Sequence, residues 1–206
     1  KMAKEISPKI ITVAGGAHFS NLVEESLKNF PIDFIVRGEG EYSFLELLKE
    51  LENKNPDLSK LKGISYRIDD KIINNPPYPL IENLDELPIP AYDLMPMDEY
   101  GKAKYLFSPG GTTIHHSRGC ISNCKFCVWW VQMAERKIEN GKEKFYPRWR
   151  TKSVEKTIEE IEILYHKYKK KFLIFVDDSF NISLEWNNKF AEELLKKNFK
   201  IGWFAF

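Results

Sequence analysis

The sequence predicts an α/β protein in which two strand-and-helix units are joined by a proline-rich connector. Short apolar runs of strand length alternate with amphipathic helical patterns in both halves of the 206-residue chain, and six prolines fall within residues 76–96. Alternation of this kind is typical of parallel α/β sheets. Hydrophobic residues make up 43% and aromatic residues 14%, so the chain has ample apolar surface to bury, which excludes intrinsic disorder.

In the first unit, buried strands are expected at Ile10–Ala14 and Ile32–Val36, because both are short β-branched runs that end next to glycines. Asn21 and Glu24 have the spacing of a capping pair, which predicts a helix through about Phe30. A second helix presents its apolar positions on one face, namely Phe44, Leu47, Leu48 and Leu51. Two strands are too few for a stable sheet, so we expect this unit to be the second half of a larger domain.

Residues 54–108 are predicted to connect the two units. Two runs, at 63–68 and 71–73, flank Asp69–Asp70 and predict a β-hairpin. The prolines that follow exclude helix and favour an extended chain. The predicted domains are therefore 1–53, the half-domain; 54–108, the hairpin and linker; and 109–206, the second α/β unit.

The second unit is predicted to follow the order strand, helix, strand, helix, strand. The expected elements are a strand at Thr112–His116, a helix capped by Ser153, a strand at Phe172–Val176 that ends in Asp177–Asp178, a helix at 187–198 with Phe190, Leu194 and Leu195 inward, and a strand at Ile201–Phe206. This order is typical of the start of a barrel or a wound sheet. A strand that ends on the last residue also suggests truncation.

The three cysteines of the sequence, Cys120, Cys124 and Cys127, lie within eight consecutive residues. An odd number in such short loops makes a disulfide framework a poor explanation. Structural zinc takes four ligands, and here His115 or His116 would have to supply the fourth. Three thiolates on one loop suit an iron–sulfur cluster in which one iron has no protein ligand. We favour the cluster and keep zinc as the alternative.

The segment Ser117-Arg-Gly-Cys-Ile-Ser-Asn-Cys-Lys-Phe-Cys127 resembles the CxxxCxΦC signature of radical S-adenosylmethionine (SAM) enzymes, with Phe126 as the aromatic residue. This resemblance implies that Cys120, Cys124 and Cys127 hold a 4Fe–4S cluster whose open iron binds SAM. It implies reductive cleavage of SAM to methionine and a deoxyadenosyl radical, with an external reductant such as ferredoxin or flavodoxin. Phe126 would pack near the SAM adenine.

In this family a Gly-Gly-Glu motif at a strand end contacts the SAM amino group, and this sequence lacks that motif. Asp177-Asp178-Ser179 stands at the corresponding strand end. The resemblance therefore implies a SAM site made by Phe126, Asp177 and Asp178.

Three further segments resemble the subgroup of this family that carries a cobalamin-binding domain. They are Gly15–His18, Val36–Glu41 and Leu84–Leu94. The resemblance implies a partial Rossmann-like cobalamin-binding domain followed by the first half of a radical SAM partial (β/α) barrel. Cobalamin would be contacted where open α/β sheets bind ligands, by Gly15, Gly16, Gly38, Glu39 and Gly40. An Asp-x-His-x-x-Gly segment, which cobalamin domains often carry, is absent.

Together these features predict a cobalamin-dependent radical SAM enzyme that transfers a methyl group to an unactivated carbon of a small molecule. The alternatives are a non-catalytic metal or electron-transfer module and a radical SAM oxidoreductase or cyclase that does not use cobalamin. The net charge of +1 argues against a nucleic-acid partner. No apolar run approaches the roughly 18 residues of a membrane span, and the N-terminus does not resemble a secretory signal. We therefore expect a cytoplasmic protein.

Overall fold

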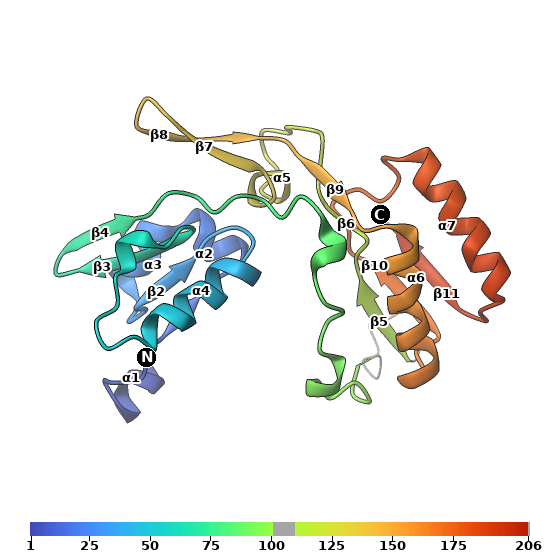
Figure 1. Cartoon of the computed structure of the whole chain (residues 1–206), viewed down its shortest axis with the longest axis horizontal. Coiled ribbons are helices and arrows are strands. Elements are labelled where there is room, and N and C mark those ends of the chain that lie inside the picture. Colours follow the sequence, from blue (N-terminus) through green and yellow to red (C-terminus); the bar gives the residue numbers. More distant parts are fainter. Residues whose placement is uncertain (101–109, 206) are drawn as a thin grey trace. The chain divides into compact units, whose positions relative to one another are not determined.

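The computed structural model describes residues 1–100 and 110–205, which form two compact units (Figure 1). The first unit contains Lys1–Ile81 and Ile121–Arg148, and the second contains Glu82–Cys120 and Trp149–Phe206. The cysteine motif is therefore divided, because Cys120 belongs to the second unit and Cys124 and Cys127 to the first. The two units group segments by their packing and do not test domain boundaries. The predicted boundaries at residues 53 and 108 therefore stay predictions.

The first unit is built on a four-stranded sheet in the order β1-β2-β3-β4. Its strands are β1 (Val13–Ala14), β2 (Phe34–Val36), β3 (Ile64–Ile68) and β4 (Lys71–Asn74). The strands β1 and β2 are parallel, as predicted, and the β3–β4 hairpin is also confirmed. The hairpin was expected to lie in the linker, but β3 pairs with β2 in antiparallel register and extends the sheet. Buried Ile64 and Tyr66 explain this, because they pack with Phe34, Val36 and Leu47.

Short helices accompany this sheet: α1 (Met2–Ile6), α2 (Ala17–Asn21), α3 (Val23–Asn29) and α4 (Glu41–Leu51). The predicted Asn21–Glu24 capping pair is wrong. The Asn21 amide donates to the Ala17 carbonyl at 2.7 Å, and the chain breaks at Leu22 between two helices. The α4 helix is confirmed, but only Leu47 and, in part, Leu51 face the core, while Phe44 and Leu48 are exposed.

The segment after the first cysteine completes the first unit. It contains α5 (Trp129–Gln132) and a second hairpin, β7 (Glu135–Glu139) with β8 (Lys142–Tyr146). Asn140 and Gly141 at its turn both have positive φ, 51° and 73°, which a tight two-residue hairpin turn requires. The α5 helix packs against α2. Sequence reasoning did not predict this hairpin.

The second unit has a parallel three-stranded sheet in the order β11-β10-β5. Its strands are β5 (Gly111–Ile114), β10 (Phe172–Phe175) and β11 (Gly202–Ala205), and a short antiparallel pair joins β6 (Ser117–Gly119) to β9 (Trp149–Thr151). The helices are α6 (Val154–Glu162), which continues as η4 (Ile163–Lys167), and α7 (Leu184–Lys197). This confirms the predicted order of strands and helices.

Caps and core of the second unit agree with the sequence in most details. The Ser153 hydroxyl accepts from the Lys156 amide at 3.0 Å, as predicted, and Ser183 caps α7 in the same way. Phe190 lies in the core, but Leu195 is 80% exposed and was wrongly placed inward. The predicted strand at 172–176 ends one residue early, because Val176 is half exposed. Residue 206 of the predicted last strand lies outside the described residues.

The later part of the connector, from Glu82, packs as part of the second unit. Within residues 82–100 the structure has only short turns, η2 (Leu84–Glu86) and η3 (Tyr92–Leu94), which agrees with the predicted non-helical chain. The Tyr92 hydroxyl donates to Glu160 at 2.6 Å, and Glu160 pairs with buried Lys152 at 2.7 Å. The Lys170 ammonium donates to the carbonyls of Met97 and Tyr100. These buried polar contacts hold the extended segment against the second unit, although the segment forms no β-sheet hydrogen bonds within residues 82–100.

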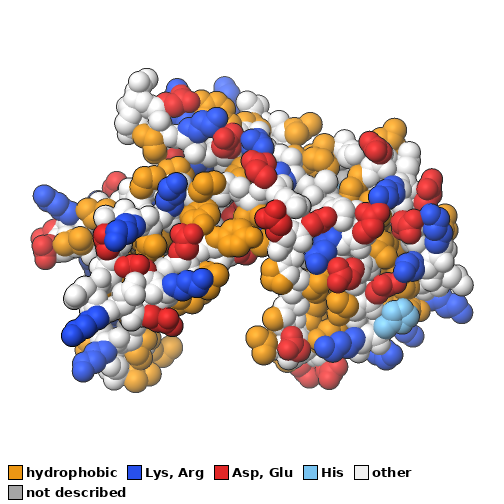
Figure 2. Space-filling view, viewed as in Figure 1, with side chains coloured by type: hydrophobic (Ala, Val, Ile, Leu, Met, Phe, Trp, Pro, Cys, Tyr) orange, Lys and Arg blue, Asp and Glu red, His pale blue; other side chains and the backbone are white. Residues whose placement is uncertain are grey.

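The surface agrees with the balanced charge of the sequence. Figure 2 shows basic and acidic side chains mixed over the described residues of the visible face. Among the described residues, no helix combines the length and apolar character needed to cross a membrane.

Candidate cluster and cofactor sites

The cysteine loop begins where β6 ends. None of the three cysteines forms a disulfide; Cys120 and Cys127 are half-buried and Cys124 is exposed. The Cys127 amide donates to the Cys124 carbonyl at 3.1 Å, and the Trp130 indole donates to the same oxygen at 2.9 Å. These two bonds close a turn between the second and third cysteines. The loop is therefore locally ordered between Cys124 and Cys127.

The donor set fits the predicted cluster. Within residues 1–100 and 110–205, no three His, Cys, Asp or Glu side chains are gathered as a ready metal site. Three thiols on one loop nevertheless supply the soft sulfur ligands that iron–sulfur clusters use. His116, one candidate for a fourth zinc ligand, is fully buried, with its ring centroid 4.0 Å from Trp186 and 4.7 Å from Phe180. This burial in an aromatic cage makes His116 a core residue.

His115, the other candidate, is half-buried beside a cation. Burial, together with Lys152 and Arg118, lowers the pKa of His115 to about 4. Its carbonyl accepts from the Lys152 ammonium at 2.9 Å. His115 is thus neutral at physiological pH, and its backbone is held by the buried Lys152–Glu160 pair.

Asp177 fastens the strand that leads into the cysteine loop. Its Oδ1 accepts from the amides of His116 and Ser117 at 3.0 and 2.6 Å and from the Ser117 hydroxyl at 2.6 Å. His116 Nδ1 lies 2.8 Å from the same oxygen. Burial opposes ionisation of Asp177, but neighbouring His116 and the bonds from Ser117 outweigh it and hold its pKa below the ordinary value. One carboxylate oxygen therefore organises the β5–β6 junction.

Asp178 is in a different state, although it is the next residue. Burial raises its pKa, and the Gly119 amide donates to its carboxylate. Its Oδ2 is buried and has no hydrogen-bond partner among the described residues. Asp177 Oδ2 is likewise buried with no hydrogen-bond partner among the described residues, so both predicted SAM-contacting aspartates keep one acceptor oxygen. What distinguishes Asp178 is its place beside Gly119, the residue that precedes Cys120.

Phe126, the predicted neighbour of the SAM adenine, is 93% exposed. Ile121 and Trp129, from the same segment, are also exposed. Exposed apolar side chains in this number are costly unless something covers them. The structure thus leaves Phe126 accessible, and its contact with SAM stays a prediction.

The predicted cobalamin glycines gather around one cavity of about 360 Å³ at the carboxyl ends of β1 and β2. Gly16 and Gly38 have positive φ, 86° and 73°, which side chains rarely adopt, and an added Cβ at either would meet nothing within 4 Å. The lining residues are Val13, Ala14, Gly15, Gly16, Val36, Gly38, Gly40, Glu41 and Phe44. Space is left because most of these residues have small side chains or none.

Glu39, the fifth predicted cobalamin residue, does not line that cavity. Its side chain is buried, and its carboxylate accepts from the Ile81 amide at 2.9 Å. Its backbone carbonyl accepts from the Ser43 hydroxyl at the start of α4. Glu39 therefore stabilises the loop between two glycines.

Sequence reasoning missed several residues that shape these sites. Trp130 is one of them, because its indole donates to the Cys124 carbonyl and so holds the cysteine turn. Arg37 and Arg136 are buried on either side of Glu143 in the first unit. The only sequence signal for Arg37 is its place directly before Gly38, and nothing local connects it to a residue 106 positions away.

Known proteins match nearly the whole of this chain, while the chain covers only part of each of them. The chain is 38% identical, over its full length, to 41% of an uncharacterized methyltransferase of Pyrococcus horikoshii. Over 98% of its length it is 31% identical to 34% of the anaerobic magnesium-protoporphyrin IX monomethyl ester cyclase of Rubrivivax gelatinosus. No family model matches the chain. The chain spans less than half the length of these relatives.

A solved structure shares the fold. It is that of the cobalamin-dependent S-adenosylmethionine radical enzyme OxsB, with aqua-cobalamin and S-adenosylmethionine bound. The TM-score is 0.73 at 24% identity, and the match covers 98% of this chain and 27% of OxsB. The mixed α/β architecture of this chain therefore also occurs in an enzyme of known structure.

Proposed function

Because the chain is a partial-length homologue of the cobalamin-dependent radical SAM enzymes, we propose that it provides the cluster loop and the cobalamin-contacting loops of a methyltransferase acting on an unactivated carbon. The observation that carries the proposal is the loop of three cysteines, none of them in a disulfide, placed directly after a strand junction fastened by Asp177. The gathering of four predicted glycines around one cavity supports it further.

In this proposal each group of residues has one task. Cys120, Cys124 and Cys127 hold a 4Fe–4S cluster. When bound, the cluster would supply the electron for reductive cleavage of SAM, and cobalamin would serve as a methyl carrier. Phe126 covers the SAM adenine, and Asp178 accepts from the SAM amino group. Asp177 positions the strand junction before the loop.

Two features of the chain support these assignments. The free Oδ2 of Asp178 can accept a cationic donor, and a carboxylate whose pKa is raised by burial gains from such a partner. The exposed Phe126 ring offers an apolar face for a nucleobase. A one-electron donor, ferredoxin or flavodoxin, would supply the reducing equivalent.

The proposal predicts SAM cleavage by reconstituted protein. Anaerobic reconstitution with iron and sulfide should give brown protein with about four irons per chain. After reduction with dithionite, addition of SAM should change the electron paramagnetic resonance spectrum of the cluster and yield deoxyadenosine on chromatography. A cluster whose spectrum does not respond to SAM, with no deoxyadenosine formed, supports an electron-transfer module instead. Colourless protein with one zinc contradicts both.

The match to a cyclase favours a radical SAM cyclase as the second candidate. We take it, as in the sequence analysis, in the form that does not use cobalamin. The two candidates share the cysteine loop and differ at the glycine cavity. Cobalamin binding, followed by the absorption change of added hydroxocobalamin, separates them. A saturable change supports the methyltransferase, and its absence supports the second candidate.

Gly40→Leu should weaken cobalamin binding about tenfold or more. Gly40 has ordinary helical backbone angles, φ −92° and ψ −14°, and an added Cβ would meet Val36 Cγ1 at 3.5 Å, an ordinary contact. The variant should therefore fold while a larger side chain occupies the cavity wall, and a lost hydrophobic fit of this kind costs 1–3 kcal/mol or so. Lys49→Leu on the exposed side of the same helix is the matched control. Equal affinity in both variants would remove cobalamin from this cavity.

A further inference from the structure

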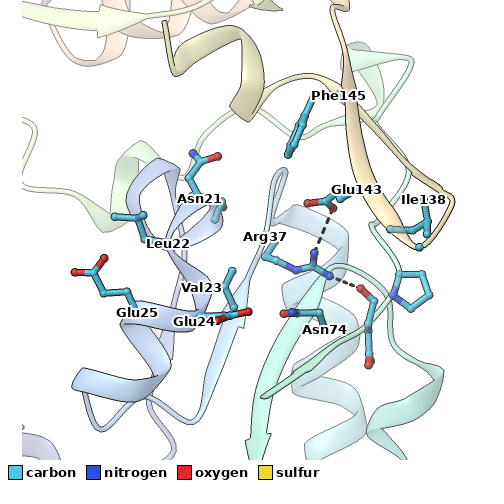
Figure 3. Close-up of a pocket in the computed structure, with 14 residues that line it drawn as sticks. Asn21, Leu22, Val23, Glu24, Glu25, Arg37, Asn74, Ile138, Glu143 and Phe145 are labelled. Atoms are coloured by element: carbon cyan, nitrogen blue, oxygen red, sulfur yellow. Dashed lines mark hydrogen bonds and ion pairs between the residues drawn. The ribbon is translucent and has the colours of Figure 1, made fainter. Parts of the chain in front are cut away.

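Two buried arginines share one glutamate where the β7–β8 hairpin meets the first sheet. Arg37 Nη1 lies 3.4 Å from Glu143 Oε1, and Arg136 Nη1 lies 3.5 Å from Glu143 Oε2. The side chains of Arg37 and Arg136 are only 6% and 5% exposed. Figure 3 shows Arg37 reaching from the end of β2 toward Glu143, in a pocket of about 760 Å³ that the hairpin bounds on one side.

The two arginines belong to different parts of the unit. Arg37 also donates to the backbone carbonyls of Ile64 and Asn75, so it is fixed to the sheet. Arg136 lies on the hairpin, with its guanidinium 5.0 Å from the centre of the Phe145 ring. Burial lowers the pKa of both arginines, and Glu143 opposes that shift. Without Glu143, two buried cations would face each other, which is strongly unfavourable.

Two segments of the chain lead away from the Arg37–Glu143–Arg136 cluster, one to the glycine cavity and one to the cysteine loop. Arg37 directly precedes Gly38, which lines the glycine cavity. The hairpin directly follows α5, whose Trp130 holds the Cys124 carbonyl. The α5 helix packs against α2, which begins just after Gly16, another residue that lines the same cavity. The cysteine segment is thus tied to both glycine loops within one compact unit.

We propose that Arg37, Arg136 and Glu143 form a clamp that positions the Cys124–Cys127 segment relative to the glycine cavity. These are positioning residues, because they act through the hairpin and α5 and touch neither cluster nor cavity ligand. The part of this proposal that concerns cofactors rests on the proposed function. The part that concerns how the three residues hold the hairpin and the Cys124–Cys127 segment in place involves this chain alone, and it can be tested without any cofactor.

The test compares Glu143→Gln with Glu139→Gln on the same hairpin. Glu139 contacts Lys144 and Tyr146 of its own hairpin and serves as the matched control. Hydrogen exchange followed by mass spectrometry is measured for residues 124–132 and 135–146 in the full chain without cofactors. Glu143→Gln should accelerate exchange in both segments about tenfold, because it opens a local unit of low stability. Glu143→Asp, which keeps the charge, should restore part of the protection.

A second readout uses the reduced cluster. Glu143→Gln should alter its electron paramagnetic resonance spectrum, and Glu139→Gln should leave it as in the wild type. Faster exchange confined to 135–146, with 124–132 and the spectrum unchanged, would overturn the clamp while leaving the proposed function intact. Failure of the wild type to assemble a cluster would count against the proposed function, and the exchange data would still decide the clamp.

Discussion

Replacing any one of Cys120, Cys124 and Cys127 by serine is expected to abolish the cluster. Bound iron should fall from about four per chain to well below one, and deoxyadenosine formation should fall about a hundredfold or more. The reason is that a serine hydroxyl is not deprotonated near neutral pH and is a hard donor, whereas iron in these clusters takes thiolate. Since the sequence has three cysteines, no other thiol can replace the one removed.

The measurement is iron and sulfide content together with visible absorption of anaerobically reconstituted protein. Asn123→Ser, an exposed substitution within the same loop, should keep the full cluster. A serine variant that retains about four irons would show that the removed thiol is not a ligand. Zinc instead of iron in the wild type, retained at full occupancy when a cysteine is replaced, would contradict the thiolate site as a whole.

The sequence was sufficient for features that depend on neighbouring residues. The spacing of three cysteines over eight positions defines a donor set without any tertiary information. The apolar run at 172–176 predicted a buried strand, because buried parallel strands are continuously apolar. The same logic placed Gly15, Gly16, Gly38 and Gly40 at strand ends, and the structure gathers them at one cavity.

The features that escaped prediction depend on contacts between distant residues. The Arg37–Glu143 pair joins positions 106 apart, and no local pattern marks either partner. The sequence pattern of the β3–β4 hairpin is the same whether the hairpin stands alone or extends a sheet, so its pairing with β2 could not be inferred from the sequence. Asp177 and Asp178 are identical in sequence terms. Only the donors around Asp177 separate their roles.

That difference leads to the second large effect, which is on stability. Asp177→Ala should lower the free energy of unfolding by about 3 kcal/mol, because it leaves the buried amides of His116 and Ser117 without an acceptor. Asp178→Asn should leave stability unchanged or raise it at neutral pH, because burial penalises its ionised form. Chemical denaturation of both variants beside the wild type measures the difference.

The pH dependence of stability should separate the two residues as well. The pKa of Asp177 is lower in the folded protein than its ordinary value of 3.8, so its contribution is present above that value and is lost as the pH falls below it. Asp177→Asn should therefore flatten the acid limb of the stability curve. The pKa of Asp178 is raised, so its protonated form favours folding and that contribution is lost as the pH rises through the folded pKa.

SAM binding should show the reverse order of effects. Under the proposed function, Asp178→Asn should weaken SAM binding to the reconstituted protein about tenfold, by removing a charge-assisted hydrogen bond. Asp177→Asn keeps an acceptor oxygen at the strand junction, so folded protein should bind SAM nearly as the wild type does. Isothermal titration with both variants measures this. If Asp177→Asn weakens SAM binding and Asp178→Asn does not, then the carboxylate that fastens the strand also contacts the ligand, and the division of tasks between the two neighbours is wrong.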